Sequence, residues 1–387
     1  KGSEYMSKTN KAIKCRIYPN VEQQILIAKT LGCSRFVYNH FLEYNNNLYE
    51  TCKKSSSYED NAKMLTQLKK EITFLNEVDS IALQQSLKHL SSAFKNFFEG
   101  RADFPKFKKK QFAEKYTTKY VNDNIRFVDS NHINLPKLGV VKIKLHRVIP
   151  SNWVIKGATV SRNSSGKFYV SIVFEFENQI TPKEINNLIG LDYSMSELYV
   201  SSNGETAEYP KYYRKSLKKL AVEQRKLSNC VYRSKNYYKQ KRKVAKLHEK
   251  IANQRKDFLH KKSREITNLY DAVCIEDLNL KEMSKPKNVK LKGKSKKVKF
   301  GKSVSDNAWG MFTEFLEYKL LDEGKLLIKV DKIFPSSQLC HICGYKNPKV
   351  KDLSIREWTC PVCNTYHNRD INAAINLKVE GQRLISV

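Results

Sequence analysis

The sequence predicts a multidomain α+β protein, in which a small β-barrel carries an inserted helical block and is followed by an α/β domain with a metal-binding insertion. Three observations predict this class. The chain has 387 residues, which is too long for one ordinary domain. Stretches that alternate apolar and polar residues flank a long helical block. Four cysteines in two closely spaced pairs stand near the C-terminus.

The N-terminal part combines one strand with three helices. Residues 12–19 alternate like a strand that ends at Pro19, and helical patterns cover 21–50, 58–74 and 79–98. The last helix repeats large apolar residues at helical spacing, which is typical of a core-facing stripe. In 104–110, phenylalanines and lysines interleave without a helical period. That segment is either a solvated charge run or a surface that stacks on bases and contacts phosphates.

The region 125–177 turns to strands. Val141, Ile143 and Leu145 alternate with polar residues, and 160–176 is typical of a hairpin around Asn163-Ser-Ser-Gly. We expect these strands to pair with the N-terminal strand. Residues 6–20 and 125–183 would then form the barrel, and 21–124 would be a helical insertion into it. Residues 1–5 are interpreted as a cloning remnant before a natural start at Met6.

The charge of the chain points to a polyanionic partner. The sequence contains 71 Lys and Arg against 39 Asp and Glu, a net charge of +32. The strongly helical stretch 211–264, which we expect to break near Asn229, holds 20 basic and 3 acidic residues. The lysine-rich stretch 281–302 is predicted to be a flexible basic loop. Nucleic acid is the favoured partner and an anionic membrane surface the competing one. No apolar run of 18 residues and no secretory segment is found, so we expect a cytoplasmic protein that does not span a membrane.

The four clustered cysteines predict a structural zinc site. Cys340, Cys343, Cys360 and Cys363 form a C-x2-C-x16-C-x2-C array, whereas the other five cysteines are scattered singly. A disulfide framework would need an oxidising compartment, which nothing else in the chain suggests. Two C-x2-C turns of this kind can present four thiolates to one Zn²⁺ at about 2.3 Å. Because four thiolates close the coordination sphere, we expect a structural ion rather than a catalytic one.

Three carboxylates stand out by their context. Asp192 and Glu276 lie in or at the end of apolar strands, where a carboxylate is costly unless it is paired or bound to a metal. Asp370 opens a C-terminal helix, so its simpler role would be to interact with the helix dipole. The order of elements around these residues is that of an RNase H-like fold, in which such carboxylates converge at one edge of a sheet. Two Mg²⁺ ions about 3.5–4 Å apart would then serve phosphodiester hydrolysis.

The ordered succession of motifs resembles the TnpB family, the transposon-encoded RNA-guided DNA endonucleases related to compact type V CRISPR effectors. The resemblance covers nearly the whole chain from about residue 11. Its motifs include Arg35-Phe-Val-Tyr-Asn-His-Phe, Phe104-Pro-Lys-Phe, Gly190-Leu-Asp, Ile275-Glu-Asp-Leu and Arg369-Asp-Ile-Asn-Ala-Ala. The family resemblance implies a wedge β-barrel, an inserted helical recognition domain, a RuvC nuclease domain at 184–335 and 367–387, and a zinc ribbon at 336–366.

The resemblance also implies partners and site residues. It implies a non-coding guide RNA, with one protein per guide RNA, and a double-stranded target DNA in the prokaryotic nucleoid. The RuvC triad would be Asp192, Glu276 and Asp370. Contacts to a short target-adjacent motif would come from residues whose alternative role is that of polar positions on a helix surface, namely Tyr58, Gln84, Gln85 and Lys88.

Two positions depart from the family pattern. Ser194 stands where a glycine is common, which could tighten the turn below the metal site, and Asn368 stands where an aspartate is usual, which removes a charge near Asp370. Neither change removes a triad member. A nuclease-inactive RNA-guided repressor, a CRISPR-derived effector of the same family and a strand-transferring recombinase remain alternatives.

Overall fold

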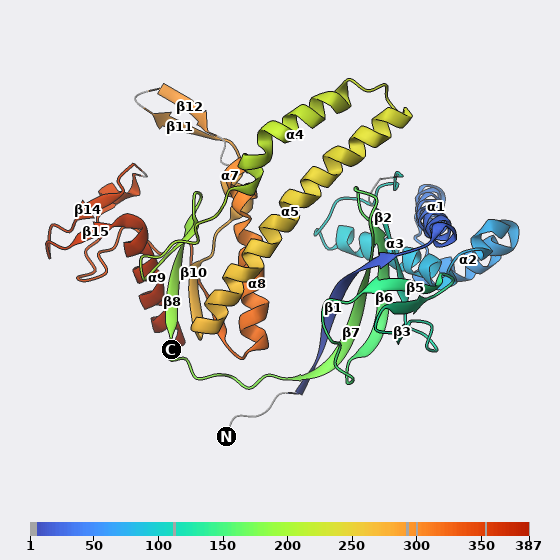
Figure 1. Ribbon diagram of the computed structural model, residues 1–387, viewed down its shortest axis with the longest axis horizontal. Helices are drawn as coiled ribbons and strands as arrows, with labels where there is room; N and C mark the ends of the chain where they lie inside the picture. Colours follow the sequence, from blue (N-terminus) through green and yellow to red (C-terminus); the bar gives the residue numbers. More distant parts are fainter. Residues whose placement is uncertain (1–5, 111–113, 292–293, 299–300, 353, 387) are drawn as a thin grey trace. The chain divides into compact units, whose positions relative to one another are not determined.

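The computed structural model describes residues 6–110, 114–291, 294–298, 301–352 and 354–386 (Figure 1). The chain divides into two compact units, which we call the N-terminal unit (6–178) and the C-terminal unit (179–387). Each is described by itself. Among the described residues, no helix is long and apolar enough to cross a membrane.

The N-terminal unit contains a seven-stranded sheet with the order β2-β6-β7-β1-β5-β4-β3. Its strands are β1 (Met6–Tyr18), β2 (Glu114–Lys119), β3 (Arg126–Asp129), β4 (His132–Leu135), β5 (Gly139–Lys144), β6 (Val154–Arg162) and β7 (Phe168–Gln179). The N-terminal strand pairs antiparallel with β5, with Ile17 opposite Ile143. β6 and β7 form the expected hairpin. Closure of this sheet into a barrel stays a prediction.

One strand of this sheet comes earlier in the chain than the sequence suggested. β2 lies within the range assigned to the helical insertion, and it pairs with β6. Its side chains at Tyr116 and Thr118 are buried while their neighbours are not. The strand is short and rich in lysine and threonine, so its period-two pattern carries little apolar contrast.

Three helices follow β1: α1 (Val21–Cys52), α2 (Tyr58–Glu71) and α3 (Ser80–Phe98), with a short 3₁₀ turn, η1 (Thr73–Asn76), before α3. α1 and α3 pack against the sheet, and α2 packs against these two helices. α1 begins with a capping box, in which Asn20 Oδ1 accepts from the Gln23 amide at 2.8 Å and Gln23 Oε1 accepts from the Asn20 amide at 3.0 Å. The apolar stripe of α3 is buried against α1 and α2, as the sequence predicts.

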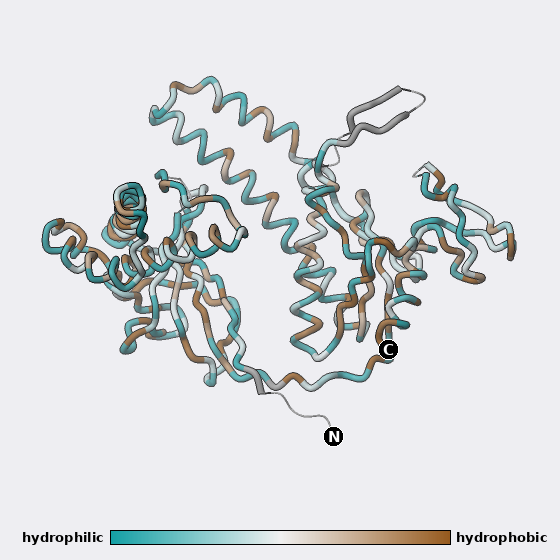
Figure 2. Tube along the Cα trace, turned by 180° about the vertical axis from the view of Figure 1, so that it is seen from behind, coloured by the Kyte–Doolittle hydropathy of each residue, from teal (hydrophilic) through white to brown (hydrophobic). Residues whose placement is uncertain are grey.

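The C-terminal unit contains a four-stranded sheet with the order β13-β10-β8-β9. Strands β8 (Leu188–Ser194), β10 (Ala272–Glu276) and β13 (Leu326–Val330) are parallel, and β9 (Leu198–Ser201) is antiparallel to β8. Helices α5 (Lys235–Leu269) and α8 (Trp309–Asp322) cover one face, and α9 (Arg369–Ile385) covers the other (Figure 1). Hydrophobic residues gather along these strands and their flanking helices (Figure 2).

The remaining elements of this unit project from the sheet. α4 (Tyr212–Ser228) and α5 form the expected antiparallel pair, broken at Asn229, the C-cap of α4. The stretch predicted as a flexible loop instead includes α6 (Leu280–Met283) and the antiparallel pair β11 (Lys287–Leu291) and β12 (Lys294–Val298), followed by α7 (Gly301–Asn307). Val289 and Leu291 alternate with lysines there, which favours strands despite the charge.

Candidate functional site

Asp192 and Glu276 lie side by side at the carboxyl edge of the sheet. β8 and β10 are parallel, and Ile275 is in register with Leu191, so the next pair along the two strands is Glu276 and Asp192. Residues in register on parallel strands point to the same face. The sequence prediction that these two carboxylates converge therefore agrees with the backbone register.

Helix α9 brings Asp370 to the same face of the sheet. A Cβ atom on Gly190 of β8 would lie 1.9 Å from the carbonyl oxygen of Ala374, and a Cβ on Gly381 would lie 2.1 Å from the Cys274 sulfur of β10. Only glycine permits these approaches. Because side chains alternate along a strand, Asp192 and Glu276, each two residues after a position that faces α9, also face this helix. Asp370 is in its first turn.

The three carboxylates interact electrostatically. The pKa of Asp192 is raised well above its ordinary value, first by loss of hydration and then by the charges of Asp370 and Glu276. The pKa of Glu276 is raised by loss of hydration. Arg369, which is itself buried, opposes the shift at Asp192. Within the described part of the chain, the four cysteine sulfurs lie as close together as the ligands of one ion. The oxygens of the three carboxylates do not.

Asp370 is held by two neighbours. Arg356 donates to its carboxylate at 3.3 Å, and both side chains keep contact with solvent. The Asn368 side chain caps α9 by accepting from the amides of Asp370 (3.1 Å) and Ile371 (3.2 Å). Asn and Asp are about equally good caps, so this departure from the family pattern keeps the capping role.

Ser194, the other departure, ends β8. Its hydroxyl oxygen accepts from the Glu197 amide at 3.3 Å and lies 3.2 Å from the Ser196 hydroxyl. The side chain thus closes the turn that leads to β9, which begins at Leu198 with a left-handed φ of 74°. A hydroxyl that makes hydrogen bonds within a turn restricts the backbone there, whereas a glycine would leave it more conformational freedom.

Sequence reasoning missed a buried polar pair behind the end of β8. Asn307 Nδ2 donates to the Ser194 carbonyl at 3.1 Å and to Tyr193 Oη at 3.3 Å. Asp306, the preceding residue, accepts from the Tyr213 amide at 3.1 Å and lies 3.8 Å from the Arg255 guanidinium. These two residues of α7 therefore join α4 and α5 to the strand that carries Asp192. Their only signal in the sequence is that two polar residues, Asp306 and Asn307, stand just before Ala308 and Trp309.

The four cysteines come together as predicted. Their sulfurs all lie within 4.8 Å of one another, with Cys340–Cys363 and Cys343–Cys360 each at 3.5 Å. Four thiolates about 2.3 Å from one tetrahedral ion would be spaced by about 3.8 Å, so the group fits a metal. Each C-x2-C turn repeats one geometry: the Cys340 amide donates to the Tyr345 carbonyl and the Cys360 amide to the Thr365 carbonyl, both at 2.9 Å.

The surroundings of the cysteines support two of the sulfurs and anchor the segment. His367, which is buried, places Nε2 3.1 Å from the Cys340 sulfur. Hydrogen bonds from Thr365 lower the pKa of Cys363 to about 6. The segment, with η2 (Pro348–Lys351), β14 (Glu357–Thr359) and β15 (Tyr366–Asn368), is fastened to α9 by Asn372 and Asn376, which both donate to the Leu339 carbonyl.

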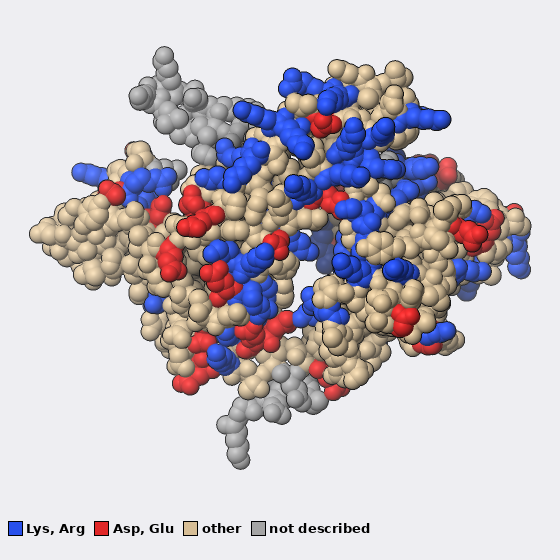
Figure 3. Space-filling model, in the orientation of Figure 1, with Lys and Arg blue, Asp and Glu red and all other residues tan. Residues whose placement is uncertain are grey.

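A basic surface covers the α4–α5 pair. Lys and Arg side chains crowd the part of the C-terminal unit formed by these two helices (Figure 3). The helices are amphipathic, and α5 buries Val244, Ile251 and Leu259, so the remaining faces carry the charge. A concentration of positive charge of this kind attracts a phosphate backbone.

The four residues expected to read a DNA motif lie in the N-terminal unit, but they differ in accessibility. The Lys88 ammonium lies 5.3 Å from the centre of the Tyr58 ring, and Gln84 is exposed beside Lys69 and Ser80. Gln85 is only 7% exposed, because α3 packs against β2 as well as α1. A buried amide cannot reach a base edge, so the structure separates Gln85 from the other three.

Taken together, a parallel three-stranded core with acidic strand ends, a helix that returns an aspartate to the same edge, and a cysteine segment before that helix define a RuvC-type fold. The solved structure described as "Cryo-EM structure of the Cas12f1-sgRNA-target DNA complex" is similar in fold, with a TM-score of 0.57 and 13% identity over 96% of this chain and 99% of that chain.

The family follows from sequence comparisons. A family model described as "Probable transposase" matches residues 171–287, and a "Cas12f1-like, TNB domain" model matches 309–377. A third, a "Helix-turn-helix domain", matches 6–54, which is here one strand and one continuous helix. A Streptomyces pristinaespiralis protein, "Putative RNA-guided DNA endonuclease", is 35% identical over 97% of this chain and 90% of its own length. The Escherichia coli "Putative RNA-guided DNA endonuclease InsQ" is 34% identical over 98% of this chain and 94% of its own length. The chain belongs to the TnpB family.

Proposed function

We propose that this protein is a Mg²⁺-dependent endonuclease that cleaves double-stranded DNA at sites chosen by a bound guide RNA. The observation that carries the proposal is the convergence of Asp192 and Glu276 on parallel strand ends with Asp370 on the helix packed against them. The relatives' descriptions as RNA-guided DNA endonucleases supply the reaction and the partners.

The carboxylates suit a divalent cation. The charges of Asp370 and Glu276 disfavour the ionised form of Asp192, and cation binding would relieve this repulsion. Asp192, Glu276 and Asp370 would hold two Mg²⁺ ions, which supply an activated water and stabilise the leaving oxygen when bound. Arg369 opposes the rise in the pKa of Asp192, and Arg356 forms an ion pair with the Asp370 carboxylate.

The cysteine cluster would hold one structural Zn²⁺ ion. Its spacing fits a tetrahedral site, and His367 and Thr365 support two of the sulfurs. With four protein ligands the ion has no open position for substrate, so its role is to fix the segment that places Arg356 beside Asp370.

For nucleic-acid recognition, the α4–α5 surface would bind the RNA and heteroduplex backbone, and base pairing would select the target. The target-adjacent motif would be read by Tyr58, Gln84 and Lys88, which reach the surface of the N-terminal unit. We leave Gln85 out of this set because its side chain is buried.

The proposal is tested with the purified complex of protein and guide RNA, a matched target plasmid and Mg²⁺. We expect guided cleavage by the natural protein, and Asp192→Ala should abolish cleavage while guided binding persists. Binding without cleavage by the natural protein would instead favour a nuclease-inactive repressor. Cleavage by Asp192→Ala near the natural rate would reject the assigned carboxylates.

A further inference from the structure

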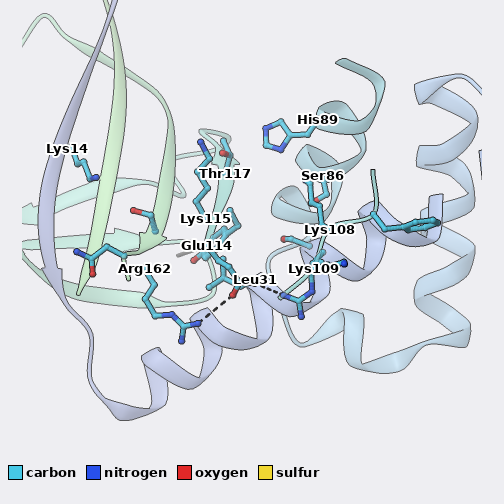
Figure 4. A pocket seen from close by; sticks show the side chains of 16 residues that line it. Lys14, Leu31, Ser86, His89, Lys108, Lys109, Glu114, Lys115, Thr117 and Arg162 are labelled. Atoms are coloured by element: carbon cyan, nitrogen blue, oxygen red, sulfur yellow. Dashed lines mark hydrogen bonds and ion pairs between the residues drawn. The ribbon is translucent and has the colours of Figure 1, made fainter. Parts of the chain in front are cut away.

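A cleft of about 720 Å³ opens in the N-terminal unit, away from the carboxylates and the cysteine cluster. Side chains from α1 and α3, from the 107–109 segment and from β1, β2 and β6 line it (Figure 4). The cleft includes the second half of the phenylalanine–lysine segment that the sequence left open between a solvated charge run and a nucleic-acid contact.

The cleft carries an excess of positive charge. One carboxylate, Glu114, faces it, and this group already bonds the guanidinium of Arg35 at 2.6 Å and lies 3.5 Å from that of Arg162. The lining holds six Lys and Arg side chains against that one carboxylate, namely Lys14, Arg35, Lys108, Lys109, Lys115 and Arg162. Five positive charges therefore have no balancing carboxylate in the lining.

Two hydrogen-bond donors in the lining lack partners within the described part of the chain. The Ser34 side chain is 8% exposed, and its hydroxyl makes no hydrogen bond there. The Nε of Arg162 is likewise buried without a partner in the described residues. A buried donor without an acceptor is costly, so both groups favour a ligand that brings acceptor oxygens into the cleft.

Lys108 is held in place before any ligand arrives. Asn39 on α1 donates to the Lys108 carbonyl at 2.9 Å and accepts from its amide at 2.8 Å, and the Lys108 ammonium lies 3.6 Å from the centre of the Tyr38 ring. Loss of hydration, and then repulsion from Lys115, lower the pKa of Lys108 to about 8. His89 also has a lowered pKa, first through loss of hydration and then through Lys108 and Lys115. An anion among these groups would relieve the repulsion.

We propose that this cleft binds one backbone phosphate of a polynucleotide, with Lys108, Ser34 and Arg162 as its donors. Phe107, which lines the cleft and is 52% exposed, would stack on an adjoining base. The inference rests on the proposed function, because the polynucleotide is either the guide RNA or the target DNA. A phosphodiester accepts charge-assisted hydrogen bonds from all three donor types.

The test removes single phosphate charges from the two nucleic acids. Target strands with one methylphosphonate at each position in turn, and guide RNA ethylated at single phosphates, are bound to the full-length natural protein and to Lys108→Gln and Ser34→Ala. For the natural protein, we expect one position, in either the RNA or the DNA, at which neutralisation weakens binding about tenfold. At that position, neutralising the phosphate should cause almost no loss of binding in Lys108→Gln and a smaller loss in Ser34→Ala than in the natural protein.

Lys106→Gln is the matched control, since Lys106 belongs to the same basic run, lies outside the cleft lining and pairs with Asp103 at 3.7 Å. It should retain the full interference pattern. If neutralisation has the same effect in Lys108→Gln as in the natural protein at every RNA and DNA position, the cleft does not bind a phosphate. Guided cleavage of unmodified DNA in the same reactions reports on the proposed function separately. Thermal melting of each variant shows whether it is folded.

Discussion

We expect the carboxylate of Asp192 to lower the stability of the folded protein when no metal ion is bound. Loss of hydration and the charges of Asp370 and Glu276 raise its pKa, so its ionised form is less favourable in the folded chain than in the unfolded one. Asp192→Asn removes the charge and keeps the shape of the side chain. We expect this variant to be more stable than the natural protein at neutral pH without divalent cations, and inactive in cleavage.

The size of the effect follows from proton linkage. A tenfold change in a proton-binding constant corresponds to about 1.4 kcal/mol. An acid whose pKa is raised in the folded state lowers the free energy of unfolding as the pH rises above its pKa in the unfolded chain. The stability gained by Asp192→Asn over the natural protein should therefore shrink as the pH falls toward 4. For a unit spanning residues 179–387, each kcal/mol corresponds to about 2–4 °C in Tm, and we expect an increase of at least that size.

The assay is scanning calorimetry of both proteins at pH 7 and pH 4.5, each with EDTA and with excess Mg²⁺. Mg²⁺ should stabilise the natural protein and have little effect on Asp192→Asn, because a cation that binds only the folded state adds stability by mass action. The reasoning is refuted if Asp192→Asn melts at or below the natural protein in EDTA at pH 7. Equal stabilisation of both by Mg²⁺ would remove Asp192 from the ion site.

Four further outcomes are expected. Asn307→Ala should raise the Mg²⁺ concentration needed for half-maximal cleavage without reducing guided DNA binding, and an unchanged midpoint would show that it does not position Asp192. Asn368→Ala should cost about 1 kcal/mol of stability in calorimetry whereas Asn368→Asp should not, as expected for a helix cap. Cys360→Ser should lose about one zinc per chain by metal analysis, together with local order; iron in the natural protein would contradict the assignment. In binding competition, Gln84→Ala should change preference for the target-adjacent motif, whereas Gln85→Ala should lower stability instead.

The sequence predicted the parts of the site that depend on local pattern. Asp192 and Glu276 end apolar runs, and parallel strand ends meet at one edge, so their proximity could be inferred from order alone. The cysteine cluster followed from spacing. Arg369 and Asn307 could not be found this way, because their roles depend on contacts with strands far away in the chain.

Two local features of the structure were not evident from the sequence. The burial of Gln85 was not evident because the apolar stripe of α3 marks only one of its two buried faces, and the second face packs against β2. The pairing of β11 with β12 was not expected because the stretch 281–302 is rich in lysine and contains glycine and proline, all of which are depleted in strands.

The glycine contacts of α9 also bear on how this architecture tolerates change. Because Gly190 and Gly381 let the helix lie directly on the strands, the place of Asp370 depends on close backbone packing as well as on the Asn368 cap and the Arg356 contact. Any side chain at either glycine would push α9 away from the strands and carry Asp370 with it. The spacing of the three carboxylates is therefore expected to be sensitive to substitution at two residues that carry no functional group.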